Sequence, residues 1–589
     1  MRKLYSAHGH RRARLASVCA LLTSIALAGA ILPAHVASAD DQDLVFQAKG
    51  FDNDGSDLID ETSMPVLGDA AARAAPAAKR TLIGAQINDP ALDNIQFFPN
   101  ALPQPQRPFE LSIQSETSMA RFGSDLVVGF NNSADQPVTL TASNTLAFVH
   151  RFLSGVSVSH DGGQSWTESS LPAIPGSPFT FGDPSVTVDR QGNFYYASLG
   201  ANAAGQSLVY VSKSADGGRT FQPGSTVTID PGSDKEWIAA GPDPRRPGHD
   251  NVYVTWTSFK ANSSQLMLGR STDAGQTWTT STLFAPVDNG VESSFIQFSN
   301  PVVDFATGRL YVPFLHGGDT DADYIKVLIS DDGGLTFRFS NFNAAGLADP
   351  TALPNVTPGT LADCGTNGGF RTVLHSGDNL GGGRLGLPVY RNATRLISQP
   401  SATVRDGWIT IAYNSSTSPV FGDPTSTSVI KAVMSFDGGV TWRGPFVVIP
   451  ATAQQPQHVH PAIAIAQGDH VGIGYYTQLA NGQLRVEAAN AELNRDTGLL
   501  GAVTTSQLSP AFDLTPSNNP LAGAPTTNYD RTIRPCYDIG EYMTATSSDK
   551  NNTTLFAWGD NRNSWTSPAA SPAAGVHSQP DVFVGSAKP

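Results

Sequence analysis

The sequence predicts an all-β protein built from repeated antiparallel sheets, and two observations support this prediction. The first is an octet of the form Ser-x-Asp-x-Gly-x-Thr/Ser-aromatic that recurs five times, at 159–166, 214–221, 271–278, 330–337 and 435–442. A fixed motif recurring at spacings of tens of residues indicates a repeat architecture. The second is that short runs rich in β-branched and aromatic residues alternate with Gly, Asp and Asn turns, which is the pattern of strands and hairpins.

The chain begins with a predicted secretory signal over residues 1–39. Basic residues precede an apolar run at 15–32, and Ala37-Ser-Ala39 matches a small-x-small cleavage site. We therefore expect a secreted, extracellular protein whose mature chain begins at Asp40, with a retained N-terminal anchor as the alternative. No later stretch is apolar enough to suggest a span of a bilayer.

The balance of charge argues against some classes of partner. Cleavage after residue 39 would leave 32 basic residues against 51 acidic ones, a net charge of −19. A surface of this sign repels nucleic acid and anionic lipid, so we expect neither as a partner. The protein is expected to be a monomer.

Residues 40–78 are polar and rich in Ala and Asp, and are predicted to form a poorly ordered leader. Within it, the run Asp52–Asp57 is similar to a calcium loop, but the EF-hand register would place Gly50 at the first ligand position. No cofactor is therefore predicted, and calcium is the alternative. A second oxygen-rich set with two histidines is a weaker candidate for a divalent cation, namely Asp538, Glu541, His458, His460 and Asp560.

Residues 79–589 are predicted to hold the repeats, and each repeat reads as four strands. A polar residue, often followed by Pro, opens a first run of alternating small and apolar residues. A second and a third β-rich run follow, and then the octet leads into a fourth. The repeats open at Glu116, Asp183, Glu236, Asn300, Gln399, His460 and Glu541, and the last two repeats lack the octet.

The octet itself predicts a tight turn. Its Asp side chain can accept hydrogen bonds from nearby backbone N–H groups, and its Gly supplies the positive φ that such a turn requires. The trailing aromatic residue is expected to fold under the turn and anchor it to the core. The five acidic residues concerned are Asp161, Asp216, Asp273, Asp332 and Asp437.

These octets resemble the Asp-box (BNR) repeat of the sialidase superfamily. The resemblance implies a β-propeller of four-stranded blades in which each Asp box joins the third and fourth strands. The last repeat is only three strands long, so we expect its missing outer strand to come from the N-terminal segment at 81–87. Seven blades are favoured, because a closed ring leaves no strand edge exposed. Six blades, as in the sialidases, is the alternative if the sixth repeat is a loop.

In a propeller the first strand of each blade lines a central channel, so the seven opening residues would form a ring at one mouth of this channel. A solvated channel alone would also favour polar residues there. Glycoside hydrolysis normally needs one protonated and one ionised carboxyl group, and crowding of like charges separates their pKa values in this way. The candidate catalytic residues are Asp183, Glu236, Glu116, Glu541 and Tyr542, and the candidate substrate-binding residues are Arg371, His460, Asn300 and Gln399.

A Gly-rich stretch at about 338–398 does not fit the repeat and is predicted to be a long inserted loop. Long loops in compact folds are usually functional or disordered. This one contains Cys364, which together with Cys536 remains once the signal is removed. Two cysteines in an oxidising compartment most simply form a disulfide, and two separate buried thiols are the alternative.

The resemblance to sialidases does not extend to their catalytic residues. Those enzymes use a Tyr activated by a Glu, an Asp as acid and base, and three Arg that bind the substrate carboxylate. Here the Phe/Tyr-Arg-Ile-Pro signature is absent, and no repeat opens on Arg. The sequence favours a secreted, sialidase-like glycoside hydrolase acting on an extracellular glycan. The alternatives are a non-catalytic propeller that binds glycan or protein, and a polysaccharide lyase with Tyr542 or His460 as base.

Overall fold

The computed structural model describes the protein as an all-β chain. Its described residues contain β-strands, one short 3-10 turn (η3, Gln467–Asp469) and no α-helix. None of the helical structure in these residues is long and apolar enough to cross a membrane. The described residues are 73–74, 84–88, 114–132, 138–140, 146–148, 151–172, 174, 177, 179–260, 264–286, 294–318, 324–340, 370–371, 399–417, 427–495, 497, 499–512, 540, 542–548, 552–566 and 576–588.

The strands form consecutive antiparallel units, numbered here in chain order. Unit 1 contains β3 (Gln114–Phe122), β4 (Asp125–Asn132), β8 (Ser154–Ser159) and β9 (Thr167–Ser170), with β1 (Arg73–Ala74) on its outer edge. Unit 2 contains β10 (Phe179–Val188), β11 (Phe194–Ala201), β12 (Ser207–Ser214) and β13 (Ser225–Ile229), with β7 (Arg151–Phe152) parallel to β10. Unit 3 contains β14 (Ser233–Pro242), β15 (Asp250–Phe259), β16 (Ser264–Ser271) and β17 (Thr279–Phe284).

The middle units follow the same order. Unit 4 contains β18 (Ser294–Gln297), β19 (Val302–Val303), β20 (Leu310–Gly318), β21 (Tyr324–Ser330) and β22 (Arg338–Phe339), and β23 (Phe370–Arg371) also pairs with β21. Unit 5 contains β24 (Ser401–Arg405), β25 (Trp408–Ser416), β26 (Ser428–Ser435) and β27 (Arg443–Ile449). A separate hairpin is formed by β5 (Val138–Leu140) and β6 (Leu146–Phe148).

The sixth repeat forms strands, although it lacks the octet. Unit 6 contains β28 (Gln457–Ile465), β29 (His470–Gln478), β30 (Leu484–Asn494) and β32 (Thr504–Gln507), with β31 (Leu499–Leu500) beside β30. It is joined to unit 5 by one parallel bridge between Ser428 and Gln457. The alternative that this repeat is only a loop is therefore wrong.

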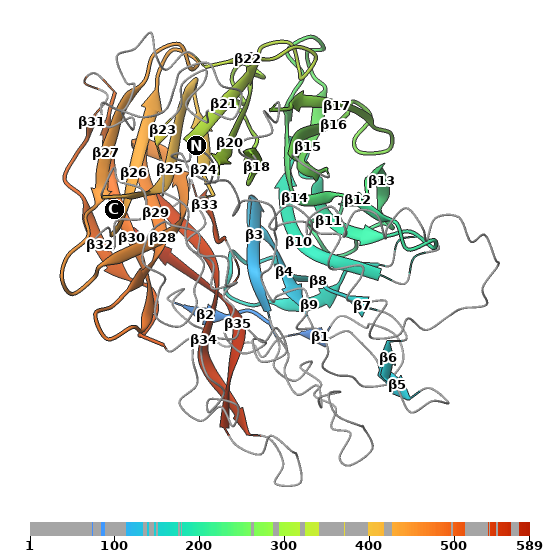
Figure 1. The fold of residues 1–589 in the computed structure, drawn as a ribbon, viewed down its shortest axis with the longest axis horizontal. Helices are drawn as coiled ribbons and strands as arrows, with labels where there is room; N and C mark the ends of the chain where they lie inside the picture. Colours follow the sequence, from blue (N-terminus) through green and yellow to red (C-terminus); the bar gives the residue numbers. More distant parts are fainter. Residues whose placement is uncertain are drawn as a thin grey trace, which may run out of the picture.

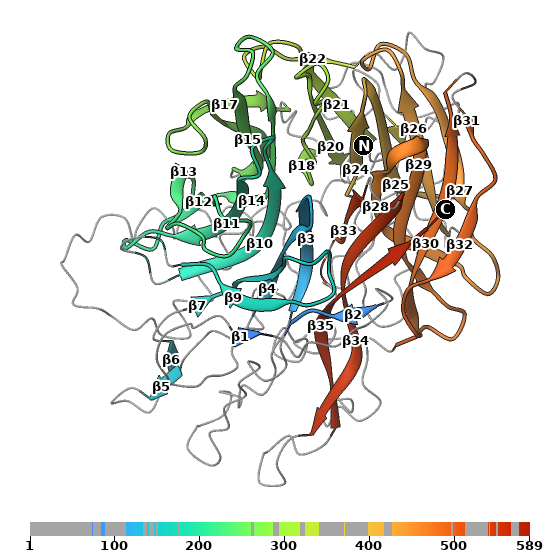
Figure 2. The same ribbon diagram turned by 180° about the vertical axis from the view of Figure 1, so that it is seen from behind.

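The N-terminal segment completes the last unit, as the sequence predicted. Unit 7 contains β33 (Thr544–Ser548), β34 (Thr553–Thr566) and β35 (Val576–Ala587), and β2 (Ala85–Gln86) pairs with β35 as its fourth strand. In Figure 1 the units succeed one another around the molecule in chain order, from β4 and β8 through β15 and β25 to β34. Seen from behind, the β34–β35 hairpin extends beyond the other sheets (Figure 2).

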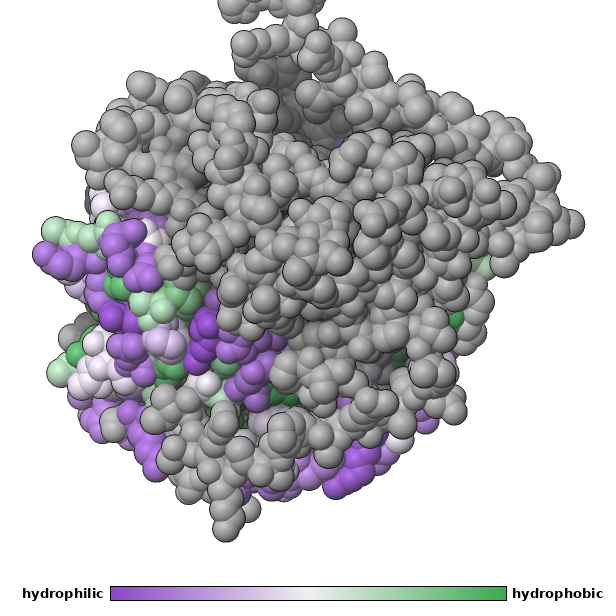
Figure 3. Space-filling view, turned by 90° about the horizontal axis from the view of Figure 1, so that it is seen from below, coloured by the Kyte–Doolittle hydropathy of each residue, from purple (hydrophilic) through white to green (hydrophobic). Residues whose placement is uncertain are grey.

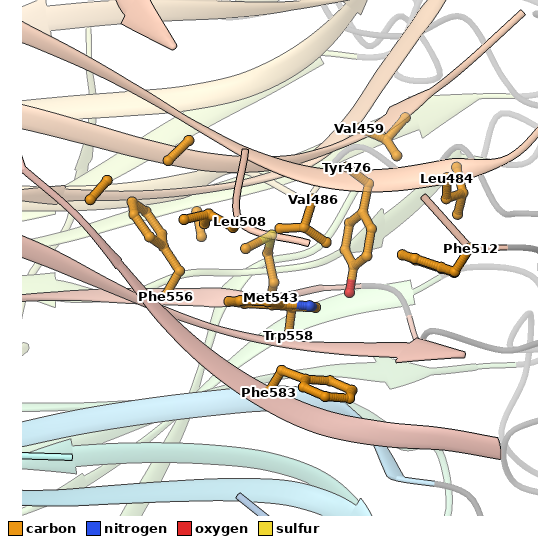
Figure 4. Close-up of a cluster of buried hydrophobic side chains, with 13 residues drawn as sticks. Val459, Tyr476, Leu484, Val486, Leu508, Phe512, Met543, Phe556, Trp558 and Phe583 are labelled. Atoms are coloured by element: carbon orange, nitrogen blue, oxygen red, sulfur yellow. The ribbon is translucent and has the colours of Figure 1, made fainter. Parts of the chain in front are cut away.

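The core lies between neighbouring units, because successive side chains of a strand point to opposite faces of its sheet. One cluster joins units 6 and 7, where Tyr476, Met543 and Trp558 pack together (Figure 4). The Tyr476 hydroxyl donates a hydrogen bond to the Gly559 carbonyl at 2.7 Å, so the buried phenol is satisfied across the junction. The described surface visible in Figure 3 mixes hydrophilic and hydrophobic residues, as is usual for a face in contact with water.

The five octets form the turns that the sequence predicted, each between the third and fourth strands of units 1 to 5. In the first, the Asp161 carboxylate accepts hydrogen bonds from the N–H groups of Gln164 and Ser165 at 2.8 and 2.9 Å. Burial opposes ionisation here, but the hydrogen bonds from Ser165, Ser159 and Gln164 lower the pKa of Asp161 to about 2. The same pattern recurs at Asp216, Asp273, Asp332 and Asp437.

Candidate functional site

The first strands of all seven units line one cavity with a volume of about 720 Å³. This agrees with the expectation that matching positions of successive repeats meet around one space. Three of the predicted substrate-binding residues lie on its wall: Asn300, Gln399 and His460. Tyr542, predicted to be catalytic, lies there as well.

One position in these strands repeats with unusual backbone geometry. In the first strands of units 1, 2, 3, 4 and 6, or next to them, one non-glycine residue has a φ near 50°. In units 1, 2, 3 and 6 the pairing between the first and second strands shifts register at this residue. Such backbone is costly for residues with a Cβ and is concentrated at functional sites. We call this the ring position. Its occupants are Glu116, Asp183, Lys235, Phe298 and His460.

The ring position corrects two sequence predictions. Lys235, not Glu236, occupies it in unit 3, and Phe298, not Asn300, occupies it in unit 4. The sequence alignment matched a polar residue followed by small and apolar ones. It could not detect that each bulge inserts an extra residue before the regular part of the strand begins.

A second repeated contact explains the place of Asn300. Two residues after the ring position, a side-chain oxygen accepts a hydrogen bond from a backbone N–H of the next unit. Ser118 accepts from Val186 at 2.8 Å, and Asn300 accepts from Ala402 at 2.9 Å. Ser185 and Ser401 do the same for Ile238 and Ile463. These contacts satisfy buried N–H groups and connect neighbouring units, and by the same spacing Gln399 stands at the ring position of unit 5.

Unit 3 departs from this pattern, because Trp237 stands where Ser or Asn accepts the bond in units 1, 2, 4 and 5. The indole of Trp237 instead meets Tyr542 of unit 7, with ring centroids 4.9 Å apart and an interplanar angle of 77°. Tyr542 is itself two residues after Gly540, which has a φ of 77°. Two aromatic residues from equivalent positions in different units therefore contact each other at the cavity.

The ring residues of units 1 to 3 form a buried ionic cluster. The Lys235 ammonium lies 3.0 Å from a carboxylate oxygen of Glu116 and 3.8 Å from one of Asp183. Asn131 donates to the other oxygen of Glu116 at 2.8 Å and accepts from the backbone N–H of Asp183 at 2.8 Å. Their exposed fractions are 0% for Glu116, 1% for Asp183 and 4% for Lys235. Burial of charge on this scale requires such pairing.

Tyr542 and Glu236 complete this cluster. The Lys235 ammonium lies 5.3 Å from the centroid of the Tyr542 ring, and the Tyr542 hydroxyl donates to the Pro184 carbonyl at 3.3 Å. Burial raises the pKa of Tyr542 well above its usual value, and the charges of Glu116, Asp183 and Glu236 raise it further while Lys235 opposes them. The phenol therefore stays protonated and acts as a hydrogen-bond donor.

The structure thus brings Glu116, Asp183, Glu236 and Tyr542 into one region. Glu541 lies outside the described residues, as do Cys364 and Cys536, and only the backbone of Arg371 is described, in β23. Lys235 and Trp237 were missed by the sequence analysis. The available signal was the run of three charged residues at 234–236, which directly precedes a strand of small and apolar residues.

Of the proposed cation ligands, Asp538 and Glu541 lie outside the described residues. Among the described residues, no group of three or more His, Cys, Asp or Glu side chains is placed to hold a metal. The Asp560 carboxylate instead accepts hydrogen bonds from Trp558 and Arg562. The Asp52–Asp57 run lies outside the described residues.

His458 gives a prediction for the dependence of stability on pH. Burial lowers the pKa of this fully buried imidazole from 6.5 to about 4, although Glu487 and the Pro450 carbonyl oppose the shift. Between these two values the unfolded chain binds a proton that the folded chain does not. We therefore expect the free energy of unfolding to fall by about 3 kcal/mol from this group as the pH drops through that window.

The measurement is urea denaturation at several pH values of the protein and of His458→Gln. The variant should lose this part of the pH dependence, while carboxylate titrations contribute equally to both proteins. Parallel pH profiles for the two proteins would contradict the assignment to His458.

Comparison with known proteins gives one relative in sequence. The chain is 23% identical over 317 residues to a sialidase of Bacteroides fragilis (strain YCH46), an alignment covering 49% of this chain and 47% of that protein. The match thus spans about half the length of that relative. No protein-family model matches the chain.

Comparison with solved structures gives low similarity scores. The NanB sialidase of Streptococcus pneumoniae aligns with a TM-score of 0.36 and 9% identity, covering 79% of this chain and 83% of that one. A protein of unknown function from Dyadobacter fermentans DSM 18053 aligns with a TM-score of 0.35 and 15% identity, covering 70% and 97%. An ulvan lyase of polysaccharide lyase family PL25 aligns with a TM-score of 0.34 and 12% identity, covering 63% and 78%.

Proposed function

We propose that this protein is a secreted, sialidase-like glycoside hydrolase that acts on an extracellular glycan. Its seven units would be the four-stranded blades of a propeller whose first strands surround the cavity. The proposal is supported by the signal-like N-terminus, by the sequence similarity to a sialidase over about half of the chain, and by the common cavity.

The observation that carries the proposal is the carboxylate pair on Lys235. One oxygen of Glu116 and one of Asp183 lie 3.0 and 3.8 Å from the same nitrogen. These two oxygens are therefore no more than about 7 Å apart, an upper limit that allows the separation of roughly 5 Å between the carboxyl groups of retaining glycosidases. A reaction that needs one carboxyl group as acid and another as base or nucleophile would find both here.

The contacts suggest how the two roles are divided. Glu116 accepts from both Lys235 and Asn131, which suits it to remain ionised as nucleophile or base. Asp183 lies farther from the ammonium and is assigned the role of general acid. Glu236, 1% exposed and next to Lys235 in the chain, is the third carboxyl group of the cluster. The raised pKa of Tyr542 disfavours this phenol as the ionised base of a lyase.

The test is turnover of a glycan panel that includes neutral oligosaccharides, sialosides and uronate polymers, followed through reducing ends and through the absorbance of unsaturated products. We expect new reducing ends without unsaturated products. Asp183→Asn should lower the rate at least about a hundredfold, as expected for loss of the general acid. Glu236→Gln should also lower the rate, because it removes a charge from the cluster. Asp406→Asn is the control: Asp406 lines the cavity and is 62% exposed, whereas Asp183 and Glu236 are buried and are not among the lining residues, so this change should leave the rate unchanged.

A second candidate is a glycan-binding propeller without catalysis, and the burial of the cluster favours it. Glu116, Asp183 and Glu236 are at most 1% exposed, as expected of charges that serve only to hold strands together. Binding of glycans with no product from any member of the panel would select this function and would reject the hydrolase.

A further inference from the structure

The cavity wall carries an aromatic side chain two residues after the ring position of unit 3. Trp237 is partly exposed to the cavity, and its orientation is held by the contact with Tyr542 at 4.9 Å. Its indole N–H makes no hydrogen bond to any residue that the structure describes. An aromatic face together with a free donor suits a ligand that has both C–H and hydroxyl groups, as a sugar ring has.

Uncharged polar groups of other units line the same cavity as this indole. Gln399 is 6% exposed, lines the cavity and makes no side-chain hydrogen bond within the described part of the chain. A buried amide of this kind calls for a partner. The amide oxygen of Asn300 is occupied by the Ala402 N–H, so its NH₂ group is the donor available to a ligand. His460 also lines the cavity, at the ring position of unit 6.

The charged residues next to Trp237 in the chain are unsuited to binding an anionic sugar. The charged residues on the cavity wall stand at or just beyond the last residues of the first strands, away from the ring position: Arg121, Asp189, Arg190, Arg405 and Asp406. The nearest described cation to Trp237 along the chain is Lys235, whose ammonium is already engaged by Glu116 and Asp183. A carboxylated sugar would compete with these two carboxylates and also meet the charge of Glu236.

We propose that the sugar bound at Trp237 is an uncharged pyranose, held by the indole and by the amides of Gln399 and Asn300. This inference rests on the proposed glycan-directed function and specifies its substrate class: neutral glycans rather than sialosides or uronates. On this proposal the similarity to a sialidase lies in the fold and not in the choice of sugar. The cation among the described ring residues, Lys235, is paired with Glu116 and Asp183 and is not available to a sugar carboxylate.

The test uses the full mature protein and methyl glycosides of glucose, galactose, mannose and N-acetylglucosamine, with those of glucuronic acid and sialic acid as the charged probes. Binding is measured by calorimetry and by tryptophan fluorescence. We expect at least one neutral glycoside to bind, and both charged probes to bind at least about tenfold more weakly, because the Lys235 ammonium is already paired with Glu116 and Asp183.

Two variants separate the role of the indole from effects on folding. Trp237→Ala should abolish binding of the neutral glycoside, and Trp237→Phe, which keeps an aromatic ring against Tyr542, should retain part of it. Phe305→Ala is the matched control, because Phe305 is a 50% exposed aromatic residue on the same cavity wall beyond the ring position. Binding by both Trp237 variants equal to that of the control would overturn the proposal, as would tighter binding of a charged probe or no binding of any glycoside.

The outcome for this site can be told apart from the outcome for the hydrolase. Neutral glycosides that bind through Trp237 while no glycan is cleaved would reject the hydrolase and retain the site. Cleavage restricted to sialosides or uronates would retain the hydrolase and reject the neutral substrate class.

Discussion

Glu116→Gln is expected to lower the free energy of unfolding by about 3–5 kcal/mol, the cost of breaking a buried ion pair by removing one partner. The substitution keeps the shape of the side chain but removes the charge that lies 3.0 Å from the Lys235 ammonium. Lys235 is only 4% exposed, so water cannot replace the lost charge, and the remaining carboxylate, that of Asp183, lies 3.8 Å away. Urea denaturation at neutral pH measures the effect.

The matched control for this prediction is Asp331→Asn. Asp331 pairs with Arg309 and Arg338, but its side chain is 49% exposed, so water replaces the lost contacts. The control should change the free energy of unfolding by less than about 1 kcal/mol. Equal effects of the two substitutions would show that the Lys235 cluster is solvated in solution, and would remove the basis for its assigned roles.

Gly540→Ala is expected to destabilise the protein by about 3 kcal/mol, because two costs add. Gly540 has a φ of 77°, which strains any residue with a Cβ, and an added Cβ would lie 2.3 Å from Cγ and 2.7 Å from the backbone nitrogen of Glu116. The second contact is with backbone and cannot be relieved by a rotamer change. The variant should therefore displace Glu116 and reduce any glycosidase activity together with stability.

Gly123→Ala is the control for Gly540→Ala. Gly123 has a similar φ of 63°, but an added Cβ meets nothing within 4 Å, so the control carries only the backbone cost of about 1 kcal/mol. Thermal and urea denaturation of both variants give the difference, which we assign to the approach of Gly540 to Glu116. A difference near zero would mean that unit 7 and unit 1 are not held as closely as the structure places them.

Much of the fold could be predicted from the sequence because its signals are local. The Asp161 turn is specified by residues within the octet, whose side chains and N–H groups bond to one another. The same holds for the four other octets. The pairing of β2 with β35 was also predictable, since the last repeat was one strand short and the strand-like segment at 81–87 was unassigned.

The candidate site was predictable only in part. Glu116 and Asp183 were found because they precede recognisable strands and share a polar character. The sequence assigned Glu236 to the ring position of unit 3, but its neighbour Lys235 occupies that position. The error arose because a bulge leaves no local sequence signature when each repeat has a different residue there. Asn300 was assigned to the ring, whereas it bonds to the Ala402 N–H of the next unit.

The sequence by itself determined the all-β class, the repeated units and the octet turns, because these depend on contacts between residues close in the chain. Only the tertiary structure decided that Lys235 joins Glu116 to Asp183, and that Trp237 meets Tyr542, which is about 300 residues away in the chain. Such contacts arise where separate units converge on one cavity. The relative positions of the bulged strands determine which residues meet there. The order of residues within one repeat does not specify these positions.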